Sequence, residues 1–461
     1  MYTALAFIEF EREFEELEKF LKICDQNKNE IGVLCFDISL RKRISNLGFD
    51  CFDPTDYFHK DDHYKCLKKL DFLEGNLADL FNNELSDKKV NYHTTLFYLS
   101  FYYSHLLYFE TLGKNIIKNN PSILKITSPT YRHEKLSSPR LENNESCLDT
   151  ISQSLSSELK LKKELYEVRC PKVKSENDIC ENIFGRLANF LSLHTLKYGL
   201  KKPTVIIGAS SHRCDSVVNK SLGQDSLIQV ISMPGLNRIK KPEYSSFLFL
   251  LKIIKLSGLY FLGIKSSYGV CYEFDFYPFK QLAQDDRTNK FNQFFTDVRK
   301  TGIIKHDLLN LLERKTIEGI NPLLGTLENV GNVLKEVFRK SKPIGFVTPH
   351  SLNGTQLLGD LSLELGIPGV LISHGSHSVP QNSEIENELK RHGLGLIHSN
   401  FDHVAIQSPL ARNYLEYFNI ERKNVPTGPL LWGTRFSDKE VIEKKEKFVI
   451  THAGSQKPRE S

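Results

Sequence analysis

Two histidines in a short polar turn are, by type and place, the residues of this chain best suited to move a proton. His374 and His377 lie in the turn Ser-His-Gly-Ser-His, at the end of an apolar run at residues 369–373. An imidazole has a pKa of about 6.5 and can accept a proton from a hydroxyl group at neutral pH. Gly375 lets a backbone or a phosphate approach closely. We predict His374 as a general base and His377 as a second catalytic group; hydrogen bonding to a neighbouring loop is the alternative for both.

Two further polar turns follow apolar runs in the same way. His350 comes after the run at residues 344–348 and precedes Ser-Leu-Asn-Gly and a helical pattern, whose first backbone amides could bind an anion. The turn after residues 203–208 offers hydroxyl groups, an imidazole and a cation for substrate binding: Ser210, Ser211, His212 and Arg213. An ordinary loop is the alternative in each case.

Two carboxylates complete the candidate groups. Asp215 closes the turn after residues 203–208 and is the alternative catalytic base. Asp37 follows the apolar run at residues 31–36, where it could meet a substrate or cap the helix that comes next. No third ligand accompanies the two histidines of the 373–377 turn, and the nine cysteines include no Cys-x-x-Cys pair. Neither a metal site nor a cofactor is therefore predicted.

Short apolar runs alternate with helical patterns along most of the chain. The runs predict strands at residues 31–36, 49–52, 123–127, 203–208, 227–231, 344–348, 369–373, 403–407 and 425–428. Helical periodicity lies between them, for example at residues 63–81, 177–198, 285–301 and 357–365. This alternation predicts an α/β fold, a Rossmann-like parallel sheet with helices on both faces. Proteins with such sheets bind ligands at the carboxyl ends of the strands, and the three polar turns are expected to lie there.

The chain divides unevenly into predicted domains. Residues 1–433 form one domain, with a long surface loop or insertion near residues 131–157 that is polar and rich in Ser and Asn. Residues 438–447 predict a charged helix, and Phe-Val-Ile-Thr-His-Ala-Gly-Ser at residues 448–455 predicts a first strand and its loop. We expect residues 434–461 to be an interdomain helix and the beginning of a second Rossmann-like domain.

Four stretches near the end of the chain resemble a known family when taken in order. Leu-Gly-Ile-Pro-Gly-Val-Leu-Ile-Ser-His-Gly at residues 365–375 is similar to a strand followed by His-Gly in capsule glycosyltransferases and CDP-glycerol-type polyol phosphotransferases. Residues 401–406, and residues 410–418 with Val-Pro-Thr-Gly-Pro at 425–429, resemble elements that close the first domain of GT-B glycosyltransferases. Residues 448–455 resemble the strand that opens the second, donor-binding domain.

The resemblance implies a GT-B glycosyltransferase of bacterial surface polysaccharide, that is, of capsule or lipopolysaccharide biosynthesis. Such an enzyme transfers a sugar from a nucleotide-sugar donor to a glycan or lipid-linked glycan acceptor. This chain would then supply the acceptor-side domain, with His374 as the base. A CDP-polyol phosphotransferase and a non-catalytic glycan-binding subunit are the two alternatives.

Composition, charge and missing motifs argue against several other classes of protein. The 461 residues have a net charge of +5, and the lysines are spread along the chain, so no nucleic-acid partner is predicted. No Walker A, Gly-x-Gly-x-x-Gly or Gly-x-Ser-x-Gly motif occurs, which removes support for ATP, NAD and serine-hydrolase chemistry. Residues 1–20 are acidic and amphipathic, unlike a secretion signal, and a cytoplasmic location is expected.

The longest apolar stretch, residues 247–264, predicts a helix for which two locations are possible. Lys252 and Lys255 interrupt it, so it is not expected to span a membrane. Both lysines lie on one helical face, opposite large apolar side chains. The helix therefore either faces the core or rests on a membrane surface, and the second location gives a peripheral contact with the inner membrane.

Overall fold

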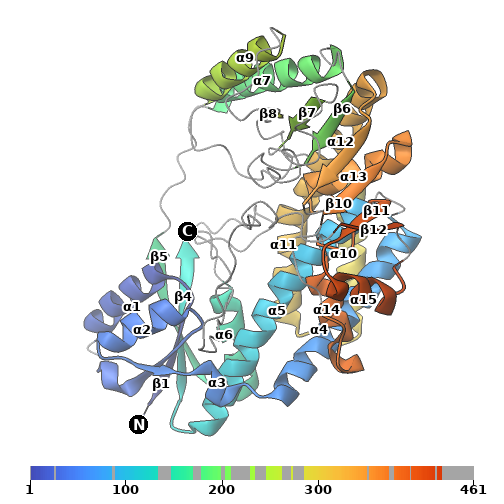
Figure 1. The fold of residues 1–461 in the computed structure, drawn as a ribbon. Helices are drawn as coiled ribbons and strands as arrows, with labels where there is room; N and C mark the ends of the chain where they lie inside the picture. Colours follow the sequence, from blue (N-terminus) through green and yellow to red (C-terminus); the bar gives the residue numbers. More distant parts are fainter. Residues whose placement is uncertain are drawn as a thin grey trace, which may run out of the picture.

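The protein is built on two parallel β-sheets in one chain (Figure 1). The computed structural model describes residues 2–24, 27–85, 89–132, 147–169, 178–198, 203–208, 229–233, 246–261, 271–273, 285–349, 352–372, 378–394, 396–420 and 423–427. Within each sheet, every pairing between described strands is parallel. The expected α/β class, with parallel sheets and Rossmann-like strand order, is confirmed.

The first sheet has the strand order β3-β2-β1-β4-β5. Its strands are β1 (Ala4–Ile8), β2 (Ile31–Cys35), β3 (Asp50–Phe52), β4 (Lys125–Arg132) and β5 (Lys162–Arg169). The helices between them are α1 (Glu11–Ile23), the 3-10 turn η1 (Lys28–Glu30), α2 (Ile38–Asn46), α3 (Pro54–Tyr57), α4 (Lys60–Asn83), α5 (Lys89–Asn119) and α6 (Leu148–Leu159).

Strand β1 lies at the centre of the first sheet and is buried on both faces. Ala4, Ala6 and Ile8 pack in a cluster with the apolar side chains of α1. Leu5 and Phe7 join the larger cluster to which α4, α5 and α6 contribute. Because successive side chains of a strand point to opposite faces, this unbroken apolar run suits a strand that is covered on both sides.

The second sheet has the strand order β12-β11-β10-β9-β6-β7-β8. Its strands are β6 (Thr204–Ile207), β7 (Gln229–Ser232), β8 (Cys271–Glu273), β9 (Gly345–Thr348), β10 (Gly369–Ile372), β11 (His403–Ile406) and β12 (Lys423–Pro426). Its helices are α7 (Asp178–Tyr198), α9 (Ser246–Phe261), α10 (Asp285–Lys300), α11 (His306–Lys315), the π-helical turn η4 (Thr316–Ile320), α12 (Asn321–Ser341), α13 (Gly354–Leu365), the 3-10 turn η5 (Ser383–Ile385), α14 (Glu386–His392) and α15 (Pro409–Tyr417).

Both sheets are wound outward from a central strand. The first strand of each sheet is central, the next two lie on one side of it, and the later ones lie on the other side, as in Rossmann-like folds. The direction changes between β1 and β4 in the first sheet and between β6 and β9 in the second. In such folds ligands bind in the crevice outside the carboxyl ends of the strands at this switch point. The chain therefore has two such switch points, one in each sheet.

Helix α5 connects the two halves of the molecule (Figure 1). It has 31 residues, so it is about 46 Å long. It packs against α4 and α6 of the first half and against α12 and α13 of the second. Tyr102, Tyr103 and Phe109 on this helix are fully or almost fully buried. Because α5 is packed on both sides of the boundary, it fixes the first sheet relative to the second.

The presence of two sheets differs from the single domain expected for residues 1–433. The strands expected at residues 31–36, 49–52 and 123–127 belong to the first sheet, whereas those from residue 203 onward belong to the second. Local patterns identify strands but not their partners, since pairing depends on contacts between residues far apart in sequence. Residues 434–461, expected to begin a second domain, lie outside the described residues.

The polar insertion expected near residues 131–157 is partly regular structure. Strand β4 runs to Arg132, and α6 begins at Leu148. Leu148, Ile151 and Leu155 of α6 are fully buried. Their spacing of three and four residues forms an apolar stripe along one face of the helix. The serines between them make the segment polar in composition, so composition alone does not reveal the helix. The expectation of a loop is therefore wrong for residues 148–157, and residues 133–146 lie outside the described part.

A glycine in β2 gives a testable prediction for stability. A Cβ atom at Gly32 would lie 2.2 Å from Cε2 of Phe52, so Gly32→Ala must displace a buried ring. We expect the free energy of unfolding to fall by about 1–3 kcal/mol in urea denaturation. Gly75, on the exposed side of α4, has nothing within 4 Å of an added Cβ, and Gly75→Ala should stabilise by about 0.5–1 kcal/mol. Equal stabilities of the two variants would contradict the packing of Phe52 on β2.

Candidate functional site

The three polar turns predicted from the sequence follow strands that are neighbours in the second sheet. Strands β6, β9 and β10 end at Ile207, Thr348 and Ile372, and they pair in the order β10-β9-β6. Their carboxyl ends therefore lie along one edge of the sheet, around its switch point. The turn residues themselves lie outside the described part of the chain, and their roles stay predictions: Ser210, Ser211, His212, Arg213, Asp215, His350, His374, Gly375 and His377.

Asp37, a predicted substrate-binding residue, lies in the described part of the chain. It precedes α2, and its Oδ1 accepts a hydrogen bond from the backbone N–H of Leu40 at 2.7 Å. A carboxylate at this position satisfies one of the free N–H groups of the first helical turn. The helix-capping alternative is confirmed, and the substrate-binding role stays a prediction.

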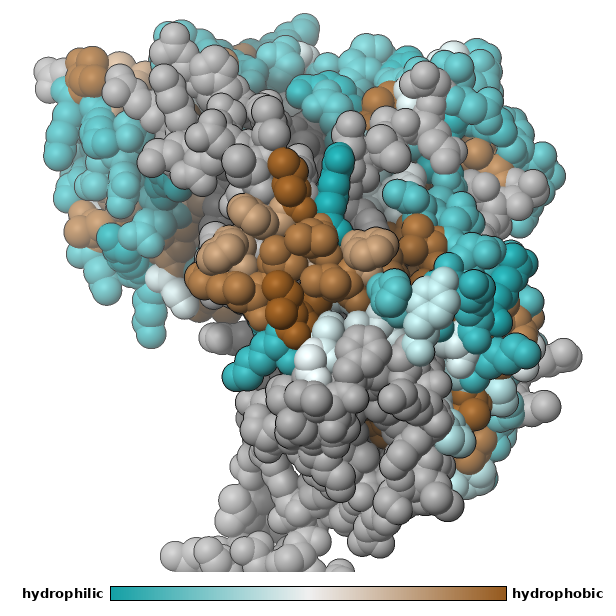
Figure 2. Space-filling model, turned by 90° about the horizontal axis from the view of Figure 1, so that it is seen from above, coloured by the Kyte–Doolittle hydropathy of each residue, from teal (hydrophilic) through white to brown (hydrophobic). Residues whose placement is uncertain are grey.

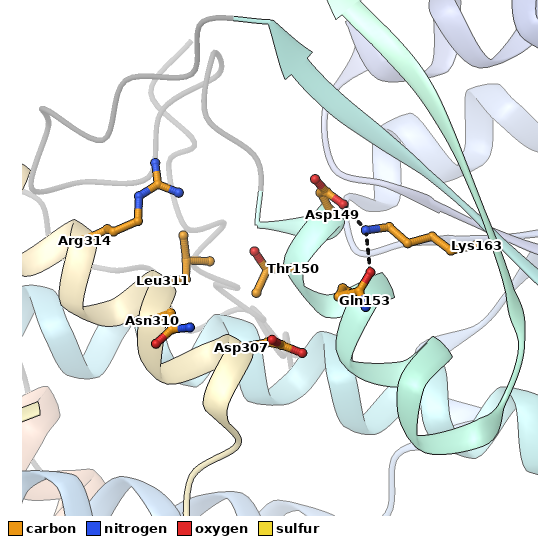
Figure 3. Close-up of a pocket in the computed structure, with 8 residues that line it drawn as sticks. All are labelled: Asp149, Thr150, Gln153, Lys163, Asp307, Asn310, Leu311 and Arg314. Atoms are coloured by element: carbon orange, nitrogen blue, oxygen red, sulfur yellow. Dashed lines mark hydrogen bonds and ion pairs between the residues drawn. The ribbon is translucent and has the colours of Figure 1, made fainter. Parts of the chain in front are cut away.

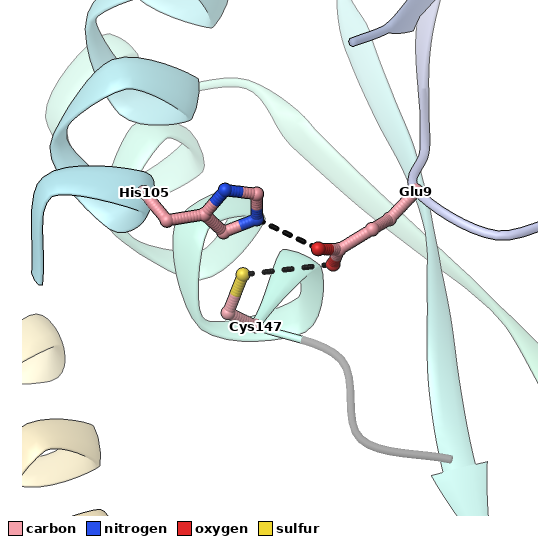
Figure 4. A group of neighbouring side chains, drawn as sticks. All are labelled: Glu9, His105 and Cys147. Atoms are coloured by element: carbon pink, nitrogen blue, oxygen red, sulfur yellow. Dashed lines mark hydrogen bonds and ion pairs between the residues drawn. The ribbon is translucent and has the colours of Figure 1, made fainter. Parts of the chain in front are cut away.

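The switch point of the first sheet holds a cluster of three side chains, Glu9, His105 and Cys147 (Figure 4). His105 Nε2 lies 2.7 Å from Glu9 Oε1, and Cys147 Sγ lies 3.9 Å from Glu9 Oε2. The Glu9 side chain is 2% exposed and Cys147 is fully buried, whereas the His105 side chain keeps 21% of its surface. The imidazole is therefore the member of the cluster that a substrate can reach.

The three side chains come from different elements around the crevice. Glu9 directly follows β1, Cys147 directly precedes α6 in the connection after β4, and His105 lies on α5. Glu9 is 96 residues from His105 and 138 residues from Cys147, so no local motif joins them. The one local signal is an acidic residue directly after the apolar run at residues 4–8, a position for which no role was predicted.

A buried carboxylate behind an exposed imidazole is suited to general-base catalysis. When Nε2 carries the ring proton, it donates to Glu9, which fixes the orientation of the ring and leaves Nδ1 able to accept a proton. Nδ1 of His105 points away from Glu9 in Figure 4. The carboxylate can also stabilise the positive charge that the ring acquires when it accepts a proton. Glu9 and His105 thus form a dyad that can deprotonate a hydroxyl group.

The same cluster is also a potential metal site. The ligand atoms of Glu9, His105 and Cys147 lie within 4.8 Å of one another, and the structure brings together no other such group among the residues it describes. A thiolate, an imidazole and a carboxylate are ligands that Zn²⁺ accepts, and three protein ligands leave one position open for water or substrate. The prediction of no metal site considered only ligands close in sequence.

A second glutamate supports the turn that bears Glu9. Glu13 Oε2 accepts hydrogen bonds from the backbone N–H groups of Glu9 and Phe10, at 2.5 and 3.0 Å, and Oε1 accepts one from the Tyr131 hydroxyl at 2.8 Å. Burial, together with the nearby charge of Glu9, raises the pKa of Glu13 to about 8. Glu13 is therefore mostly protonated at neutral pH, and it fixes the start of α1 without adding a second full charge beside Glu9.

Helix α5 also reaches the switch point of the second sheet. The Tyr98 hydroxyl accepts a hydrogen bond from Nδ2 of Asn353 at 2.7 Å, and His93 Nδ1 lies 2.5 Å from Nε2 of Gln356. Asn353 directly precedes α13, the helix after β9. Tyr98 and His105 are seven residues apart, which places them on similar faces of α5 and about 10.5 Å apart along its axis. One helix therefore contacts the groups at both switch points.

The start of α13 is held close to the ends of β6 and β9. A Cβ atom at Gly208, just after β6, would lie 2.9 Å from Leu358 Cδ1 and 3.3 Å from Thr348 Oγ1, so glycine permits this close approach. Asn353 has φ 50° and ψ −126°, a backbone conformation that residues other than glycine rarely adopt. Because α13 follows β9, its N-terminal end lies at the carboxyl edge of the sheet. The dipole of that end favours anions such as phosphate.

A pocket of about 230 Å³ lies between α6, β5 and α11 (Figure 3). Asp149, in the first turn of α6, is two residues from Cys147. Lys163 of β5 bonds to Asp149 and, at 3.2 Å, to Gln153, and the Arg314 side chain lies on the facing wall. Such a mixture of donors and acceptors can bind hydroxyl groups, which both donate and accept. The full lining is Asp149, Thr150, Gln153, Lys163, Asp307, Asn310, Leu311 and Arg314.

Comparisons with protein-family models, with curated proteins and with solved structures found no match to this chain. The fold, the two switch points and the cluster of Glu9, His105 and Cys147 are therefore the basis for a proposal on function.

Proposed function

We propose that this protein is a glycosyltransferase that moves a sugar from a nucleotide-sugar donor to a glycan or lipid-linked glycan acceptor of a bacterial surface polysaccharide. The main support is that one chain contains two parallel sheets of Rossmann-like order, and that α5 contacts the groups at both switch points. The two contacts are about 10.5 Å apart along one helix, which suits a reaction that joins two bound substrates.

The second sheet is the proposed donor side. The N-terminal end of α13, with its positive helix dipole, would face the diphosphate of the donor. The turns at residues 209–215 and 373–377 follow β6 and β10, the two strands that pair with β9, and would supply hydroxyl, imidazole and guanidinium groups. In this arrangement His374 and Gly375 would contact the phosphates of the donor, and the role of His374 as the base becomes the alternative.

The first sheet is the proposed acceptor side. The acceptor oxygen bonds to the anomeric carbon, the bond from that carbon to the nucleoside diphosphate breaks, and Nδ1 of His105 takes the hydroxyl proton. Glu9 stabilises the imidazolium ion that forms. The pocket along α6 would bind other hydroxyl groups of the acceptor.

The two alternative functions, a CDP-polyol phosphotransferase and a glycan-binding subunit, differ from the proposed one. The first uses another donor, and the second has no turnover. The same dyad could activate a hydroxyl group against the phosphorus of a CDP-polyol, so the identity of the donor separates the two enzymes. A non-catalytic glycan-binding subunit is the other alternative, and it would bind glycan without turnover. Two sheets within residues 4–426 favour an enzyme over that subunit.

Donor binding is the experiment that tests the proposed function. We expect one nucleoside diphosphate from a panel of five bases to raise the melting temperature, with about 2.7 kcal/mol of stabilisation at a concentration near 100 times its Kd. The matching nucleotide-sugars are then screened for release of that nucleoside diphosphate, since water can replace the acceptor slowly. A response to CDP-polyols alone would support the phosphotransferase, and no response to any nucleotide would contradict both enzymes.

A further inference from the structure

Helices α7 and α9 form an apolar surface on the outside of the second half of the molecule (Figure 2). They pack together through Ala188, Leu250 and Ile253, and the rings of Phe184 and Phe247 meet at 5.4 Å. Large side chains that are between 44% and 61% exposed line both helices: Ile183, Leu187, Phe190, Tyr198, Phe247, Leu248, Leu251 and Ile254. We call these eight residues the α7/α9 surface. Of the apolar side chains on α9 that could face either the core or a membrane, Leu250 is buried, whereas Phe247, Leu251 and Ile254 are exposed.

Most charges around the α7/α9 surface are positive, and the acidic residues of α7, Asp178 and Glu181, lie at its N-terminal end, before the surface begins. Residues 183–198 and 246–261 include no Asp or Glu, whereas they include Arg186, Lys197, Lys252 and Lys255. Lys197 and, from α12, Lys340 also approach the Tyr198 ring, at 5.6 and 5.2 Å. An apolar face bordered by cations complements a surface that is apolar inside and negatively charged outside, which describes a bilayer containing anionic lipids.

We propose that the α7/α9 surface docks on an anionic membrane, with both helices lying in the plane of the interface. Their apolar side chains enter the boundary between headgroups and acyl chains, and the four cations contact the headgroups. A second copy of the chain is a poorer occupant, because a symmetric contact would bring the same cations together. Among the described helices none is long and apolar enough to cross a bilayer.

Vesicle co-sedimentation of the full chain tests this proposal. We expect binding to vesicles of phosphatidylcholine with phosphatidylglycerol, and much weaker binding to phosphatidylcholine alone. The double variant Leu251→Glu/Ile254→Glu should weaken binding by more than about tenfold, because it places charges at the depth of the apolar side chains. Lys252→Gln/Lys255→Gln should weaken binding to the anionic vesicles by about fivefold per lysine, without affecting folding.

A matched control uses exposed leucines elsewhere on the protein. Leu363 and Leu410 are 50% and 49% exposed on α13 and α15, and Leu363→Glu/Leu410→Glu should bind vesicles as the wild type does. The proposal is overturned if the wild type does not bind anionic vesicles, or if the Leu251/Ile254 variant binds them equally well. It is also overturned if the wild type forms dimers that this variant disperses while neither binds lipid, since the surface would then cover a second copy.

Discussion

Replacing His105 by glutamine is expected to slow sugar transfer by about 10²–10⁴-fold while leaving the donor affinity nearly unchanged. The amide nitrogen of glutamine can take the place of Nε2 and keep the hydrogen bond to Glu9, but the side chain cannot accept a proton. The loss should therefore appear in kcat and not in the binding of the donor. Initial rates and donor titrations of the two proteins measure both quantities.

A second histidine–glutamate pair provides the control. His63 Nε2 lies 3.0 Å from Oε2 of Glu388, and this pair joins α4 to α14. His63→Gln should transfer sugar at the wild-type rate. If His105→Gln also keeps the wild-type rate while His374→Gln loses it, the base lies in the turn after β10 and the proposal for His105 is wrong.

The second large effect concerns the dependence of stability on pH. The pKa of Glu13 rises from 4.5 to about 8 on folding, because of burial first and the charge of Glu9 second. The folded protein therefore holds a proton that the unfolded chain releases above about pH 4.5, and this contribution to stability is lost as pH rises toward 8. At about 1.4 kcal/mol per pKa unit, the free energy of unfolding should fall by several kcal/mol over this interval.

Urea denaturation between pH 5 and 9 measures this effect as the difference in the free energy of unfolding between the wild type and a Glu13 variant. Glu13→Gln stays neutral at every pH, so its stability relative to the wild type should increase as pH rises. Glu15→Gln, on the exposed face of the same helix, is the control and should follow the wild-type profile. A constant difference between Glu13→Gln and the wild type across this range would show that Glu13 is ionised in the folded protein.

The elements of the second sheet were predictable where the sequence separates them clearly. Strands β9 and β10 and helix α13 are short and bounded by Gly or Pro, so their patterns do not run into one another. Strand β1 was missed because its run of Ala, Leu and Phe favours helix as much as strand and continues into the acidic helix α1. Missing β1 also meant missing Glu9 as a residue at the carboxyl end of a strand.

The candidate site depends on contacts that no local pattern specifies. Glu9, His105 and Cys147 meet because β1 and β4 pair and α5 packs beside them. The exposure of Leu251 and Ile254 depends on which face of α9 packs against α7, which periodicity alone leaves open. Sequence patterns therefore predicted the class of fold, whereas the three-dimensional pairing was needed to find these groups.

The most direct test of how the two substrates are divided between the two sheets is amide hydrogen exchange. It is measured with and without the nucleoside diphosphate that the protein binds. The proposed donor site predicts slower exchange in peptides covering residues 345–357, which include the end of β9 and the start of α13. Exchange in residues 4–23, which form β1 and α1, should not change. Protection confined to residues 4–23 would place the nucleotide on the first sheet and contradict this division.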